Sequence, residues 1–161
     1  MALTKFTAYA LALALWGCGA SEVEQKELKD YVAKLQGFED MNRQINSYTT
    51  LLNDPANEVG VEDLAAARKL IDDYIAAMQA IPLEMEYTDL RRIHNLYGGS
   101  KLVDAQKLAA DTGREVDRER GNVVIGTKHI QKMVSELYRN LDVLWLRQDI
   151  SDPYTLKWPE G

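Results

Sequence analysis

The stretch that decides the fold covers residues 122–148 and reads NVVIGTKHIQKMVSELYRNLDVLWLRQ. Its apolar residues recur at spacings of three and four, which places them on one face of an α-helix. This pattern predicts a helix that opens near Asn122 and ends near Gln148. Because its apolar face is continuous, the helix must be buried against other elements. The residues of this face are Ile125, Ile130, Met133, Val134, Leu137, Leu141, Leu144 and Trp145.

Three similar apolar stripes precede it. The first predicts a long helix over residues 21–53, where Ser21 and Glu24 have the spacing of a capping box. The second predicts a helix from about residue 62 until Pro82, which cannot continue it. The third predicts a helix over about residues 88–112, capped by Thr88 and bent where two glycines follow each other at 98–99.

Composition agrees with a helical protein. The 161 residues include only 4 prolines, and Leu, Ala, Glu, Lys and Gln favour helices. Short connections make neighbouring helices antiparallel. We therefore expect an all-α fold, an antiparallel up-down four-helix bundle with a long first helix. Residues 21–150 would form this one domain, and residues 151–161, with two prolines, an irregular C-terminal tail.

The N-terminal residues 1–18, MALTKFTAYALALALWGC, have the pattern of a secretory signal peptide. Lys5 supplies a positive charge, and the apolar run from Phe6 to Trp16 follows it. That run is too short for a transmembrane helix, which needs about 20 apolar residues. Small Gly17 then precedes Cys18. Residues 1–17 would be removed, and residues 18–20 would form the mature N-terminus.

Leu15-Trp16-Gly17-Cys18 resembles the lipobox of bacterial lipoproteins, although Trp16 departs from the usual small or β-branched residue. The resemblance implies that Cys18 receives the lipid, becomes the first mature residue and anchors the protein to a membrane. Cys18 is also the only cysteine, so lipidation would leave no reactive thiol. In the enterobacterial sorting pattern an Asp after the lipidated Cys retains a protein in the inner membrane, so Gly19 favours the outer membrane, facing the periplasm, if the host is Gram-negative. The alternative is an ordinary secretory signal with a chance cysteine.

Catalytic and cofactor motifs are missing from the sequence. The residues three before His94 and His129 are Arg91 and Gly126, so the Glu-x-x-His pairs of di-iron bundles are absent. A single Cys excludes covalent haem and cysteine zinc sites. No serine lies in Gly-x-Ser-x-Gly or Ser-x-x-Lys. We predict no catalytic, metal-binding or cofactor-binding residue and no cofactor. The net charge of −6 argues against binding nucleic acid.

Aromatic residues near the C-terminus are candidates for partner contact. Trp145 widens the apolar face of the last helix, while Tyr154 and Trp158 lie in the tail. Tyr and Trp suit both protein interfaces and membrane interfaces. The alternative is that the tail packs back over the bundle.

The leading hypothesis is a lipid-anchored protein of the cell envelope. It would act without catalysis, as an accessory, pilot or assembly factor, through contacts with a protein partner. A second hypothesis is a periplasmic bundle that binds a small molecule or cofactor in a cavity lined by Met41, Tyr74, Tyr97 or His129. A third is a structural spacer that associates with itself through the first helix. An enzyme also stays open, because a site assembled in three dimensions needs no linear motif.

Overall fold

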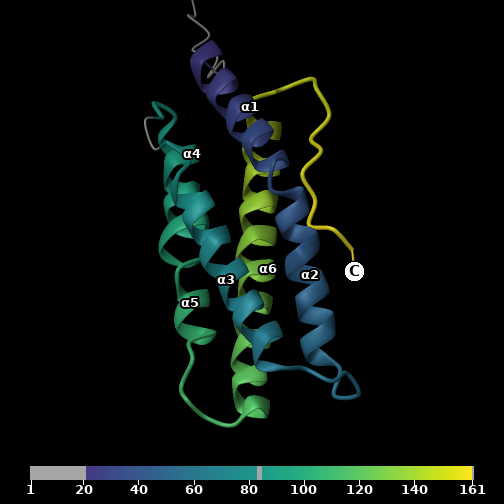
Figure 1. Ribbon diagram of the computed structural model, residues 1–161. Helices are drawn as coiled ribbons and strands as arrows, with labels where there is room; N and C mark the ends of the chain where they lie inside the picture. The colour runs from purple at the N-terminus through teal and green to yellow at the C-terminus, as the bar shows by residue number, and fades with distance from the viewer. Residues whose placement is uncertain (1–20, 83–84, 161) are drawn as a thin grey trace, which may run out of the picture.

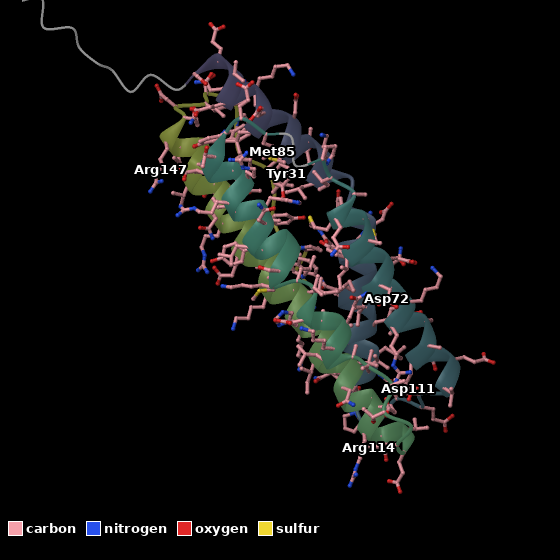
Figure 2. The ribbon with its side chains drawn as sticks, turned by 90° about the vertical axis from the view of Figure 1, so that its left-hand side faces the viewer. Tyr31, Asp72, Met85, Asp111, Arg114 and Arg147 are labelled. Atoms are coloured by element: carbon pink, nitrogen blue, oxygen red, sulfur yellow. The ribbon has the colours of Figure 1, made fainter. Side chains whose placement is uncertain are left out.

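The computed structural model describes residues 21–82 and 85–160, and all regular structure in this part of the chain is helical. The helices are α1 (Glu22–Gln36), α2 (Glu39–Asn53), α3 (Val61–Gln79), α4 (Thr88–Ile93), the π-helical η1 (His94–Ser100), α5 (Asp104–Leu108) and α6 (Val116–Arg147). The all-α prediction is confirmed. Figure 1 shows the helices lying along one long axis. Figure 2 shows Tyr31 and Arg147 near one end, with Asp111 and Arg114 at the other.

Helix α6 is the element against which the others pack. It contacts α1, α2, α3, α4, α5 and η1, and Figure 1 shows it running the length of the molecule. The helix predicted over residues 122–148 is therefore present, and it ends at Arg147. Ile125 is an exception to the predicted stripe, because its side chain is 52% exposed, whereas Val123 and Val124 are buried.

The start of α6 is a correction, because the helix begins at Val116 rather than at Asn122. Glu119 explains the extra turns. Its buried carboxylate accepts hydrogen bonds from Arg68 (2.6 Å) and from the Thr112 backbone (3.0 Å), so it ties the loop to α3. The hydrogen bond from the Thr112 hydroxyl is the main reason that the pKa of Glu119 lies below its usual value. The first turns of α6 therefore lie within a run of charged residues, and one of these charges, on Glu119, is turned inward.

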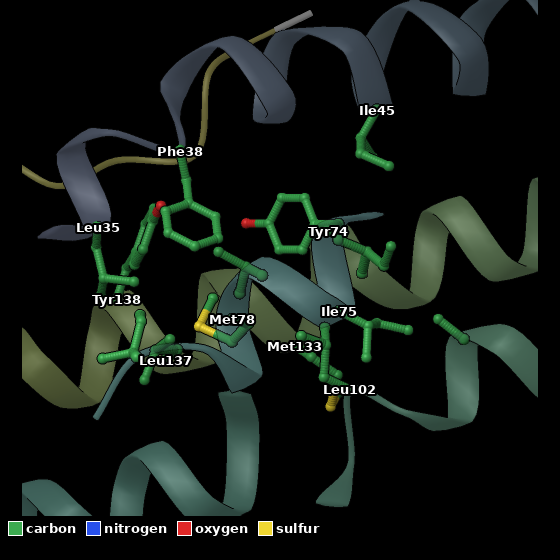
Figure 3. Packing of buried hydrophobic residues seen from close by; sticks show 14 of the residues in the cluster. Leu35, Phe38, Ile45, Tyr74, Ile75, Met78, Leu102, Met133, Leu137 and Tyr138 are labelled. Carbon is green, nitrogen blue, oxygen red and sulfur yellow. The ribbon is translucent and has the colours of Figure 1, made fainter. Parts of the chain in front are cut away.

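The long first helix is also corrected, because it is two helices, α1 and α2. The Ser21 cap is present, with its hydroxyl accepting from the Glu24 backbone at 3.0 Å. At the other end of α1 the Gly37 and Phe38 amides bond to carbonyls three residues back, which tightens the turn. Phe38 enters the core there, and its ring lies edge-on to Tyr74 at 5.4 Å. Figure 3 shows this packing.

The predicted third helix, residues 88–112, is divided into α4, η1 and α5, and α4 begins after Tyr87 with no side-chain cap from Thr88. The wide π-helical turn brings Gly98 against α3. A Cβ atom on Gly98 would lie 3.1 Å from both the His94 ring and Met78. The Gly98-Gly99 bend is therefore a π-helical stretch. None of the described helices is long and apolar enough to span a membrane.

Gly126 lets α5 approach α6 closely. A Cβ atom there would lie 2.7 Å from the Ala109 Cβ, 3.0 Å from the Ala105 carbonyl oxygen and 3.1 Å from Ile71. Two of these neighbours are backbone or the first side-chain carbon, so they cannot rotate away. Gly121, on the same helix, has no atom within 4 Å of an added Cβ.

We predict opposite effects for alanine at these two glycines. Gly121→Ala should stabilise the protein by up to about 1 kcal/mol, because alanine favours the helix. Gly126→Ala should destabilise it by about 1–3 kcal/mol, because α5 must shift away. Urea unfolding of both variants measures the difference. A Gly126→Ala protein as stable as the Gly121→Ala protein would refute the close packing of α5 on α6.

Candidate functional site

The C-terminal tail lies in a groove between α2 and α6. After α6 the chain turns at Asp149, which has a positive φ of 49°, and then runs back along the bundle (Figure 1). The Trp145 indole donates to the Asp152 carbonyl oxygen at 2.7 Å, and the Tyr154 hydroxyl donates to the Tyr138 carbonyl oxygen at 2.6 Å. Leu156 is the buried apolar anchor of the tail. The tail is irregular, as the sequence predicted, and it packs on the bundle.

Asn46 of α2 fastens the end of the tail. Its amide nitrogen donates to the Pro159 carbonyl oxygen at 2.7 Å. Its amide oxygen accepts from the Trp158 indole and from Gln131 of α6, each at 2.7 Å. One side chain thus binds both the backbone and a side chain of the tail, which is how a groove recognises an extended peptide.

The tail fills its groove incompletely. Three cavities border it, of about 530, 520 and 430 Å³. The first lies between α1, α2, α6 and the tail, the second beside Asn46 and Pro159, and the third beside Tyr154 and Trp158. All three are open to solvent, so the surface beside the tail has room for other groups.

A buried polar network forms the floor of the first cavity. The Tyr74 hydroxyl donates to the Asn42 amide oxygen at 2.7 Å, and the Asn42 amide nitrogen donates to the Tyr138 hydroxyl at 3.0 Å. Asn42 and Tyr138 line the cavity, and both are nearly inaccessible to solvent, at 2% and 4% exposed. Burial raises the pKa of Tyr138, so its hydroxyl keeps its proton at neutral pH.

The predicted partner-contact residues all make contacts within the chain. Trp145 is buried, and its ring meets the Tyr154 ring at 5.7 Å. Tyr154 and Trp158 are half-buried in the groove. Cys18, the predicted lipidation site, lies outside the described residues.

The residues proposed for a cofactor cavity do not share one. Tyr74 is fully buried in the core and Met41 packs against it. Tyr97 and His129 do meet, in a surface cavity of about 450 Å³ with Lys101. His129 Nε2 lies 2.7 Å from the Lys101 carbonyl oxygen, which occupies one ring nitrogen.

His94 is the buried titratable group of the core. Its Nδ1 lies 2.7 Å from the Tyr31 hydroxyl, and the two rings are edge-on at 5.4 Å. Burial lowers the pKa of His94, which favours the neutral ring, and its Nδ1 shares a hydrogen bond with the Tyr31 hydroxyl. In residues 21–82 and 85–160, no group of three or more His, Cys, Asp or Glu side chains is placed to hold a metal ion.

Sequence reasoning missed Asn42 and Asn46. The signal that points to them is a polar residue within a stripe of apolar residues, since a buried amide needs hydrogen-bond partners. The comparisons with known proteins add nothing, because no protein-family model, curated protein or solved structure matches the chain.

We predict that His94 makes stability depend on pH. Below about pH 6.5 the unfolded chain binds a proton that buried His94 does not, so stability should fall as pH decreases. The change His94→Gln, which still offers Tyr31 an acceptor, should flatten the dependence between about pH 7.5 and 5. His129→Gln is the control. Urea unfolding across this range is the measurement, and an unchanged slope in His94→Gln would contradict the prediction.

We also predict that Asn46 controls release of the tail. Asn46→Ala removes three hydrogen bonds, and trypsin cleavage after Lys157 should become about tenfold faster, because the tail opens more often. Ser47→Ala is the matched control, since its hydroxyl bonds only to the Arg43 carbonyl oxygen of its own helix. Mass spectrometry of the digest reports the rate. Equal cleavage of both variants would show that Asn46 does not fasten the tail.

Proposed function

We propose that the protein is a lipid-anchored component of the bacterial cell envelope that works without catalysis, as an accessory, pilot or assembly factor. Its anchor would be lipid on Cys18, in the outer membrane and facing the periplasm. The lipobox-like residues 15–18 and the signal pattern before them support this address. Ser21, which caps α1, follows Cys18 closely in the sequence, so the bundle would sit near the membrane surface.

The observation that carries the binding role is the groove that holds the tail. Five hydrogen bonds fasten the tail, from Gln36, Asn46, Tyr154, Trp145 and Trp158. At about 1 kcal/mol each, with about 6 kcal/mol from Leu156 and the half-buried rings, they total about 11 kcal/mol. Ordering residues 152–159 costs on the order of 10 kcal/mol. The tail is therefore held marginally.

A groove with a weakly held occupant can accept a competing segment. The occupant here is extended, carries aromatic and aliphatic side chains, and is recognised partly through its backbone carbonyls. We infer that the partner presents an extended segment of the same chemistry, which enters between α2 and α6 as the tail leaves. Peptide grooves commonly combine backbone hydrogen bonds with side-chain pockets in this way.

We further propose that the helices are best grouped as an antiparallel up-down bundle of four. In this grouping α1 and α2 form the first member, α3 the second, the run from α4 to α5 the third, and α6 the fourth. The contacts of α6 with each of the others support it.

The first test is mass spectrometry of the protein extracted from its native membranes in mild detergent. We expect a chain that begins at lipidated Cys18 and a stoichiometric companion protein. A Cys18→Ser variant should lose the lipid and the membrane association. An unmodified start at another residue would refute the anchor.

The second test places a photo-crosslinking amino acid at Thr50, which lines the groove beside Pro159. The companion should crosslink from Thr50 and not from Asp73, an exposed position on α3. Crosslinking from Asp73 alone would show that the companion binds another surface of the protein. It would not affect the conclusion about the lipid on Cys18.

A further inference from the structure

In the polar network beneath the tail, Tyr74 donates a hydrogen bond to Asn42 and Asn42 donates one to Tyr138. The proton of the Tyr138 hydroxyl has no acceptor among the described residues. Tyr74 is fully buried, so its proton needs an acceptor, and the Asn42 amide oxygen provides one. The Asn42 amide nitrogen then donates to the Tyr138 oxygen. Turning the amide over would leave the Tyr74 proton unpaired in the core, which costs more than the observed arrangement.

The Tyr138 hydroxyl is therefore an acceptor for Asn42 and still has its own proton to donate. Among the described residues no side-chain or backbone oxygen is within hydrogen-bond geometry of that proton. The hydroxyl belongs to a residue that lines the cavity of about 530 Å³. Asn42 has a second amide proton, for which residues 21–82 and 85–160 likewise provide no acceptor. Two residues that line the cavity thus each hold one donor without an acceptor in this part of the chain.

The cavity walls define what would fit. Leu35 and Leu156 give it apolar sides, and Lys157 brings a positive charge. Glu39 also lines it; its exposed carboxylate pairs with Arg43 at 2.5 Å, and its charge adds to burial in raising the pKa of Tyr138. Two donors and a lysine among the residues that line the cavity favour an anionic oxygen acceptor, while the apolar sides favour a hydrocarbon body. The volume is in the range of small-molecule sites, about 300–1,000 Å³.

We propose that this cavity binds a small organic carboxylate, which accepts hydrogen bonds from Tyr138 and Asn42 and pairs with Lys157. The raised pKa of Tyr138 keeps the hydroxyl protonated for this role. The proposal is independent of the anchor and of the partner. The tail forms one wall of the cavity, so a bound carboxylate would hold the tail closed and oppose a competing segment.

Sodium benzoate is the probe, titrated into the native protein and followed by backbone and side-chain amide NMR signals. We expect saturable shifts at Asn42, Tyr138 and Leu156, with a dissociation constant below about 1 mM. Benzyl alcohol, which has the same ring without the carboxylate, should bind more weakly.

Tyr138→Phe should weaken benzoate binding about tenfold or more, since a hydrogen bond to a charged group is lost. Lys157→Gln should also weaken it. Tyr97→Phe is the control, because its hydroxyl lies at another cavity.

Three results would overturn the proposal. The first is the absence of a saturable shift at the cavity residues of the wild-type protein. This result does not depend on the folding of any variant. The second is benzyl alcohol that binds as tightly as benzoate. The third is a Tyr138→Phe protein, folded by circular dichroism, that binds benzoate as well as the wild type.

Discussion

The burial of α6 is the constraint on which the rest of the structure depends. A helix of 32 residues is about 48 Å long, and the core residues of its apolar face need cover along most of that length. No other helix here is long enough to cover it alone. The cover is therefore shared among α1 to α5 and η1, and two of the breaks between these pieces occur where a buried side chain enters the core. Phe38 enters between α1 and α2, and His94 enters where α4 becomes η1.

Two groups of polar side chains inside this core satisfy one another. Tyr31 and His94 form one pair, and Tyr74 with Asn42 and Tyr138 form a chain. A tyrosine among apolar residues contributes its ring to packing but costs about 1–3 kcal/mol if its hydroxyl lacks a partner. The first pair is closed, since a hydroxyl meets a neutral ring nitrogen. The series from Tyr74 to Tyr138 ends at a residue that lines a cavity, and its last hydroxyl still has a proton to donate. For this reason we treat the Tyr31–His94 pair as a structural contact and the Tyr138 end of the series as a candidate site.

The sequence predicts those parts of the fold that depend on periodicity. The apolar face of α6, the Ser21 cap and the irregular tail follow from residue type and spacing alone. The breaks at Phe38 and His94 do not, because they depend on where a side chain meets another helix. The start of α6 was placed too late, because Glu119 looks solvated in sequence and is buried only through Arg68 and Thr112. For the candidate site, the sequence predicted partner contact by the aromatic residues of the tail, which stays a prediction, and it gave no indication of Asn42 or Asn46. A single asparagine in a helix gives no sign of which distant tyrosine or tryptophan it will bind.

The tail's attachment to α6 sets how strongly a partner must bind. Because the tail is tethered next to its groove, it competes at an effective concentration near the millimolar range. If closure of the tail is favourable by about 2 kcal/mol, the groove is open about 3% of the time, and a partner's apparent affinity falls about 30-fold. Weak, nonspecific segments would then be excluded, whereas a segment that fills the cavities the tail leaves empty gains contacts that the tail lacks. The open space beside the tail is therefore what would allow the proposed partner to compete with a tethered occupant.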